Sequence, residues 1–127
     1  MSLRFQKDGK EMKEFLGKQV EVIIDRPMGS KHPRCEIIYP VNYGFVPGTI
    51  ARDGKEIDAY VLGESEPLDK YKGYVIAYIH RKNDNEDKLV VAKELNRYCK
   101  EQVQTLTEFV ERAFDIEIII HESNSLN

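Results

Sequence analysis

The sequence predicts a β-rich α+β fold, in which a small β-barrel or open sheet is closed by one helix near the C-terminus. Two observations support this prediction. Short runs rich in β-branched residues recur between turn residues from residue 18 to residue 92. Only one late stretch, residues 101–114, repeats its apolar residues at the spacing of an amphipathic helix.

The predicted strands can be placed in order along the chain. Residues 18–25 (KQVEVIID) alternate between polar and β-branched, as a half-buried strand does. Residues 35–50 are aromatic and β-branched but contain two prolines and two glycines, so short bent strands are expected there. Residues 57–64 form the next predicted strand. Residues 74–80 and 88–92 are predicted to pair as a hairpin around the polar turn RKNDNED.

The helix is predicted from four residues at three- and four-residue spacing: Val103, Leu106, Val110 and Ala113. Residues 116–120 (IEIII) follow it and are either a final short strand or a buried extension, because periodicity does not separate the two.

Length and composition predict one globular domain over residues 1–127, with residues 1–17 as an N-terminal arm. Hydrophobic residues make up 41% and charged residues 32%, which argues against a disordered chain. The formal charge is −3 and the pI is about 5.7. This balance disfavours a nucleic-acid partner, including the alternative of an OB-type single-strand binder, because such proteins neutralise phosphates with a basic face.

A cytoplasmic location is expected. Cys35 and Cys99 are far apart in sequence, which is typical of reduced thiols in a cytosolic protein. The N-terminus has no apolar core of a signal peptide, and no stretch is apolar enough for a membrane span. The opening Met1-Ser2-Leu3 is compatible with an expression-vector remnant.

Two polar turns are rich in carboxylates, which are the ligands that Mg²⁺ prefers. The carboxylates are Asp53, Glu56 and Asp58 in DGKEID, and Asp84, Glu86 and Asp87 in NDNEDK. Solvated hairpin turns are the alternative, since Asp, Asn and Gly are common in such turns. A site is favoured because Asp58 and Lys88 each open an apolar strand, where a ligand is held more rigidly than at a loop tip.

Basic and phenolic residues flank these turns. Carboxylates that face Lys31, Arg34 and Lys88 would form a site for a metal–phosphate complex. Tyr39 and Tyr43 are candidate donors to a phosphate oxygen, and the alternative for either is a half-buried aromatic in the core.

The order of these segments resembles that of the soluble family I inorganic pyrophosphatases. The segments are IDRP, a basic loop, YPVNYGFVPGTI, DGKEIDAYVL and NDNEDKLVVA. The specific part is residues 39–62, where Y-P-x-N-Y-G-aromatic precedes D-G-x-E-x-D, and a looser resemblance covers residues 19–92. The resemblance implies an OB-like barrel flanked by helices, and an active site in which several Mg²⁺ ions activate a water that attacks pyrophosphate.

The resemblance also assigns metal ligands. Asp53 and Asp58 match the first and last aspartates of the family signature. Asp84, together with Asp87 or Glu86, resembles a second group of metal-binding carboxylates. Asp25, also a candidate metal ligand, matches an acidic residue on the second strand of the family.

The phosphate-binding residues follow from the same resemblance. Lys88 and Tyr43 match residues that contact phosphate in the family, and Lys31 or Arg34 would add a basic contact. The residues that the resemblance implies for catalysis are Asp53, Asp58, Tyr43 and Lys55.

Lys55 stands where the family signature has its middle aspartate. Two unit charges about 4 Å apart interact by roughly 4 kcal/mol at an effective dielectric of about 20, so a lysine in the site would oppose a second cation. Alternatively, Lys55 extends into solvent or acts as a fixed positive charge against the substrate. The segment between Arg34 and Tyr39 is also short, and Ala113 and Phe114 stand where the family has a Tyr-Lys pair.

The expected function is therefore Mg²⁺-dependent hydrolysis of inorganic pyrophosphate, or of a related small phosphoanhydride. The alternative is a non-catalytic or altered-substrate phosphate-binding module on the same fold. A homo-oligomer is compatible with either function.

Overall fold

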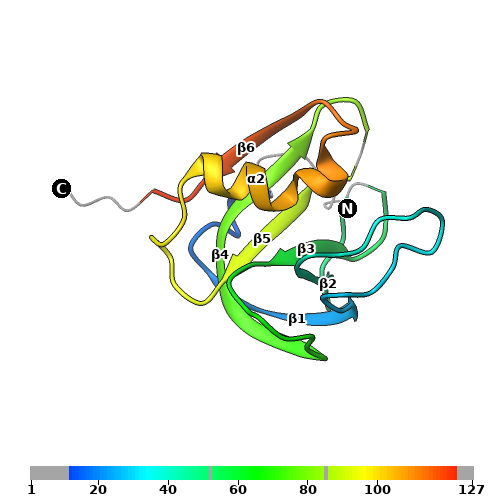
Figure 1. The fold of residues 1–127 in the computed structure, drawn as a ribbon. Coiled ribbons are helices and arrows are strands. Elements are labelled where there is room, and N and C mark those ends of the chain that lie inside the picture. The colour runs from blue at the N-terminus through cyan, green and yellow to red at the C-terminus, as the bar shows by residue number, and fades with distance from the viewer. Residues whose placement is uncertain (1–11, 52, 85, 123–127) are drawn as a thin grey trace.

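Five strands close on themselves into a small barrel, and a sixth strand extends one wall of it (Figure 1). The structure is a computed structural model that describes residues 12–51, 53–84 and 86–122. The described elements are β1 (Gln19–Arg26), β2 (Asn42–Val46), β3 (Ile57–Val61), β4 (Lys70–Arg81), β5 (Lys88–Ala92), α2 (Lys100–Glu111) and β6 (Ile116–Ile120).

The barrel closes because β4 pairs with both of its ends. The strand order is β1-β2-β3-β5-β4, and β4 then pairs back to β1. The first part of β4, residues 70–74, lies against β1, whereas residues 77–81 lie against β6. The β3–β5 pair is parallel and the other pairs are antiparallel. The predicted β-rich α+β fold, a small OB-like barrel with a helix near the C-terminus, is confirmed, but strand pairing and not the helix closes the barrel. Residues 116–120 are a strand.

Two apolar layers follow from the alternation of side chains along these strands. One layer draws residues from all five barrel strands and fills the interior; its members include Val22, Val46, Ala59, Val75 and Leu89. The other covers the outer face on which α2 packs; its members include Tyr60, Ile79, Val90, Val103 and Ile118. Because β5 is buried on both faces, all of its residues are buried and its sequence lacks alternation.

The predicted elements are present with shifted ends. The predicted strand 74–80 is part of the longer β4, and the hairpin with β5 is confirmed. Within residues 35–50 the structure has the short strand β2, and an isolated bridge joins Lys31 to Ile38. The predicted helix 101–114 begins one residue earlier and ends at Glu111.

The described part of the chain begins at Met12. Residues 1–11 of the predicted arm, including Met1-Ser2-Leu3, lie outside the described residues, whereas Met12 is buried in the barrel interior. Cys35 and Cys99 are free and exposed. None of the helices in the described part of the chain has the length and apolar character needed to cross a membrane.

Candidate phosphate and metal site

Asp58, Tyr43 and Lys88 form a hydrogen-bonded cluster on the outer face of the barrel. The Asp58 Oδ2 atom accepts a hydrogen bond from the Tyr43 hydroxyl at 2.9 Å and one from Lys88 Nζ at 2.7 Å. Lys88 Nζ also donates to the Tyr43 hydroxyl at 3.0 Å. The three side chains come from three different strands, so the rigid barrel fixes their spacing.

Strand register explains why these residues meet. β3 and β5 run parallel with Ala59 opposite Leu89, and both of these side chains face the barrel interior. The preceding residues, Asp58 and Lys88, therefore both face outward at the starts of neighbouring strands. Tyr43 on β2 is opposite Tyr60 on β3 and faces outward as well.

Electrostatics keep Lys88 charged and Tyr43 neutral. Burial lowers the pKa of Lys88, but the neighbouring Tyr43 and Asp58 raise it, and the net shift is above the usual range. Burial also raises the pKa of Tyr43 above its usual range, and the negative charge of Asp58 adds to this shift against the opposing effect of Lys88. The cluster therefore presents an ammonium group and a phenolic hydroxyl as donors, which are the groups that bind a phosphoryl oxygen.

The carboxylates of the second turn separate into two environments. Glu86 Oε1 accepts a hydrogen bond from Lys88 Nζ at 3.0 Å and therefore joins the cluster. Asp87 is 4% exposed and lies 3.1 Å from the His80 Nδ1 atom, and one of its oxygens accepts from the backbone N–H of Arg81. Because neighbouring residues of a strand face opposite sides, Asp87 points away from the side that Lys88 faces.

Asp84 lies near Arg81, with 3.5 Å between Asp84 Oδ2 and the guanidinium. Asp25 is within electrostatic range of Asp58: burial raises the pKa of Asp25, Arg26 lowers it, Asp58 raises it, and the net shift is upward.

The first turn places Asp53 and Lys55 at an exposed tip. Asp53 Oδ1 accepts a hydrogen bond from the backbone N–H of Lys55 at 3.0 Å, as aspartates in turns do. Gly54 has a φ of 86°, a conformation that favours glycine, which explains the Asp-Gly pair. The side chains of both Asp53 and Lys55 are exposed, so the structure groups Asp58 with the cluster and leaves these two at its edge.

The basic loop before β2 is also exposed. Lys31 pairs with Glu36 at 3.3 Å, and Arg34 is exposed with its backbone N–H donated to the ring of His32. The predicted donor Tyr39 is 3% exposed, and its hydroxyl accepts a hydrogen bond from Arg26 at 2.8 Å. Sequence reasoning missed Arg26, which ends β1 on the same face as the cluster.

Sequence reasoning also missed a buried ion pair beneath the site. Arg81 donates to the two oxygens of Glu111 at 2.9 and 2.7 Å, and the Tyr60 hydroxyl donates to Glu111 at 2.6 Å. Arg81 also lies over the ring of Phe114 at 3.7 Å. The available signal was that Val103, Thr107 and Glu111 recur every four residues, which places the glutamate on the buried face of α2.

Comparison with known proteins identifies the family. A family model described as inorganic pyrophosphatase matches residues 10–119. The chain belongs to the inorganic pyrophosphatase family. A curated inorganic pyrophosphatase of Saccharolobus solfataricus is 32% identical over an alignment of 98 residues, and the match covers 62% of this chain and 57% of that protein. The chain thus spans little more than half the length of this relative.

Solved structures support the same fold. The inorganic pyrophosphatase of Ehrlichia chaffeensis superposes with a TM-score of 0.65 at 16% identity, covering 84% of this chain and 88% of that one. The enzyme of Neisseria gonorrhoeae gives a TM-score of 0.57 at 22% identity, covering 73% and 72%. At these identities the likeness establishes the OB-like fold, and the resemblance to the family I pyrophosphatases is confirmed by the family model.

Divalent metal is general in the pyrophosphatase family, and the residues can be tested for it. Within the described residues, no group of three or more His, Cys, Asp or Glu side chains is close enough to hold a metal ion. Mg²⁺ does not need such a cage, because it binds through one or two carboxylates, waters and substrate phosphates. Asp58 is 37% exposed, and the hydrogen bonds described for it reach only Oδ2. A partly exposed carboxylate whose other oxygen takes part in none of these hydrogen bonds fits that mode of binding.

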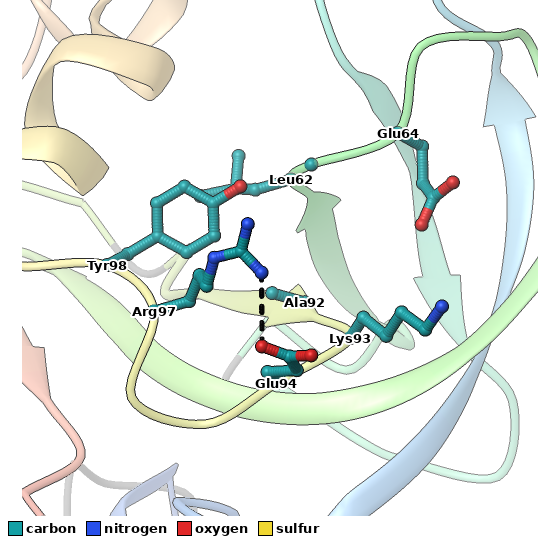
Figure 2. A pocket seen from close by; sticks show the side chains of 8 residues that line it. Leu62, Glu64, Ala92, Lys93, Glu94, Arg97 and Tyr98 are labelled. Atoms are coloured by element: carbon teal, nitrogen blue, oxygen red, sulfur yellow. Dashed lines mark hydrogen bonds and ion pairs between the residues drawn. The ribbon is translucent and has the colours of Figure 1, made fainter.

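A cavity of about 90 Å³ lies at the opposite ends of β3 and β5 from this site (Figure 2). Figure 2 shows Arg97 pointing toward Glu94, and the two pair at 3.1 Å. Both side chains are more than half exposed, at 66% and 60%. This surface pair is remote from the Asp58–Tyr43–Lys88 cluster and supplies matched control positions.

Proposed function

We propose that this chain hydrolyses inorganic pyrophosphate to phosphate with Mg²⁺ in the cytoplasm, using the Asp58–Tyr43–Lys88 cluster. The observation that supports the proposal is the joining of a carboxylate, a phenol and a buried ammonium within 3.0 Å of one another. The family match, and the inorganic pyrophosphatase from Saccharolobus solfataricus, support the choice of substrate. The net charge of −3 supports a small-molecule substrate and no nucleic-acid partner.

The chain's own residues account for binding and charge stabilisation. Lys88 holds a permanent positive charge against the phosphoryl oxygens as negative charge develops on them. The neutral Tyr43 hydroxyl orients the same group when its single proton turns from Asp58 to the phosphoryl oxygen. Asp58 fixes both donors through one oxygen.

In this proposal the metal is held at the same cluster. Asp58 would hold Mg²⁺ through the oxygen that the cluster's hydrogen bonds leave unused, and Asp25 or Glu86 would supply a second carboxylate. Bound Mg²⁺ would supply neutralisation of phosphate charge and a lower pKa for a nearby water. The predicted ligands Asp53 and Asp84 stay in this proposal as more distant carboxylates, and Asp87 would have to turn away from His80 to join them.

A non-catalytic phosphate-binding module is the second candidate. One observation favours it: the cations beside the site already have carboxylate partners. Lys88 pairs with Asp58 and Glu86, and Arg81 pairs with Glu111. A site neutralised in this way binds an anion more weakly, because these contacts must be shared with the ligand.

Phosphate release from Mg²⁺–pyrophosphate tests the proposal. We expect Asp58→Asn to lower kcat by about 100-fold or more, comparable to loss of one stabilising group at an active site. The matched control is Glu94→Gln, which makes the same carboxylate-to-amide change at an exposed position in the distant cavity.

The outcomes separate the two candidates. Turnover by the wild-type protein that does not exceed that of Asp58→Asn would overturn the enzymatic proposal. If calorimetry still detects pyrophosphate binding in that case, the binding module is correct. Sedimentation of the same samples measures whether the chain forms the proposed homo-oligomer.

A further inference from the structure

Arg26 is the last residue of β1 and lies opposite Tyr43 of β2. We infer that its guanidinium binds a phosphoryl oxygen of the substrate, alongside Lys88 and Tyr43. The inference rests on the proposed function, and it adds a residue and a recognition chemistry to the same site.

A β-bulge places Arg26 on the face of the cluster. In the β1–β2 pair, Ile23 is opposite Phe45 and Ile24 is opposite Gly44, so regular pairing would set Asp25 opposite Tyr43. The register shifts between Ile24 and Arg26, and Arg26 becomes the partner of Tyr43. Bulges of this kind are frequent next to active sites, where they redirect a side chain.

Gly44 permits this close approach of β1 to β2. A Cβ atom built on Gly44 would overlap the backbone carbonyl of Ile23 and lie 2.8 Å from the Cα of Ile24. No side chain fits there, so glycine at position 44 is required by the strand that presents Arg26. The local sequence therefore supports the bulge as a built feature of the fold.

Directly opposed residues of an antiparallel pair share a face, with Cβ atoms about 5 Å apart. Arg26 therefore lies on the same face as Tyr43, whose hydroxyl contacts both Asp58 and Lys88. A small diphosphate bound at Tyr43 lies within reach of the longer arginine side chain.

The side chain of Arg26 is held in place and is still able to donate. Its Nη1 atom donates to the Tyr39 hydroxyl at 2.8 Å, and its Cζ lies 5.7 Å from the centre of the Tyr39 ring. Tyr39 is fixed in turn by edge contact with Phe109 of α2. Arginine has five N–H donors, so one hydrogen bond to Tyr39 leaves most of them available to a ligand.

The other cations near the site differ from Arg26. Lys88 and Arg81 have carboxylate partners, and Lys31 pairs with Glu36. Among the ion pairs of the described residues, none involves Arg26, which is only partly exposed. Burial lowers the pKa of Arg26, whereas Tyr39, Tyr43 and Asp25 raise it, so the group stays charged.

These properties suit a phosphoryl group, whose charge the neighbouring Lys88 ammonium also attracts. A planar guanidinium donates two parallel hydrogen bonds to a phosphate, and a pre-oriented one loses little side-chain entropy on binding. The ligand class is thus a phosphoanhydride with a free terminal phosphoryl group, of which pyrophosphate is the smallest.

The experiment compares Arg26→Gln and Arg26→Lys with the wild type and with the control Arg97→Gln, whose arginine is exposed in the distant cavity. Two quantities are measured: KM and kcat for Mg²⁺–pyrophosphate, and the calorimetric Kd of methylenediphosphonate, a non-hydrolysable analogue. Urea unfolding of each variant reports on folding. Because Arg26→Lys keeps the charge and the apolar stem, it serves if Arg26→Gln does not fold.

We expect Arg26→Gln to raise both KM and the analogue Kd by about 10-fold or more, as expected for loss of a charge-assisted contact. Arg26→Lys should raise KM and the analogue Kd by a smaller factor, because lysine keeps the positive charge but lacks the two parallel N–H donors of the guanidinium. Arg97→Gln should change neither. An analogue Kd for Arg26→Gln within twofold of wild type, with or without a lower unfolding midpoint, would assign Arg26 a structural role and overturn the inference alone. A wild-type protein that neither hydrolyses pyrophosphate nor binds the analogue overturns the proposed function and this inference together.

Discussion

Glu111 is the most informative position for testing how α2 is attached to the barrel. Its side chain is 1% exposed and accepts three hydrogen bonds, two from Arg81 and one from Tyr60. Arg81 is 4% exposed, and contact with Glu111 raises its pKa further above the usual range although burial opposes this. Because an arginine guanidinium does not lose its proton in a protein, Arg81 stays charged in any folded Glu111 variant.

The substitution Glu111→Leu removes the two short hydrogen bonds of the buried guanidinium and leaves it the longer contacts with Asp84 and Glu86, at 3.5 and 3.7 Å. Breaking a buried ion pair on one side costs about 3–5 kcal/mol, more than a surface pair, for which the cost is about 0–1 kcal/mol. For a chain of this size we expect the Tm to fall by roughly 10–20 °C. Urea unfolding with m-values compared between variants measures the change in free energy.

Two further variants test the physical reason. The triple variant Tyr60→Phe, Arg81→Met and Glu111→Leu replaces the whole network with apolar groups of similar volume, and we expect it to regain most of the lost stability. The surface control Glu94→Gln should change the free energy of unfolding by less than about 0.5 kcal/mol. A loss below about 1 kcal/mol for Glu111→Leu would refute the reasoning, because it would mean that Arg81 reaches water or another partner.

Two other predictions concern the site lysines. The raised pKa of Lys88 means that its contribution to stability is fully present below about pH 10.5 and is lost as pH rises through the higher pKa of the folded state. The free energy of unfolding of the wild type in urea should therefore exceed that of Lys88→Met by a constant amount from neutral pH to about pH 10, and by less above pH 10. A difference that grows above pH 10 would contradict this. Lys55 is exposed, so Lys55→Asp should leave Mg²⁺-dependent turnover within about twofold of wild type. A rise in turnover would mean that Lys55 opposes a cation, and a fall would mean that it contacts substrate.

The sequence predicted the barrel strands and the helix well where burial imposes a period. The long β4 was predicted only from residue 74, because residues 70–73 (KYKG) are mostly polar and become strand by pairing with β1. That pairing joins segments about fifty residues apart, and local patterns hold no information about it. The same pairing closes the barrel. The sequence alone did not distinguish a closed barrel from an open sheet.

The site was predicted in part. Asp58 and Lys88 were singled out because each opens an apolar strand, and parallel pairing of β3 and β5 brings them together. Glu86 and Asp87 were left as alternatives, and the structure places Glu86 in contact with Lys88 and Asp87 in contact with His80. Asp53 and Asp58 belong to one motif, but one lies at an exposed turn and the other on a strand.

The sequence by itself determined the family, the β-rich barrel and the residue types from which a phosphate site can be built, because these follow from local patterns of burial, turns and charge. Tertiary structure decided which charges meet. The bulge that exchanges Asp25 for Arg26 opposite Tyr43, and the burial of Glu111 against Arg81, both depend on backbone approach between distant segments. A buried charge is stabilised only by partners that the fold brings next to it. The roles of Arg26 and Glu111 therefore depend on tertiary contacts that no local sequence pattern contains.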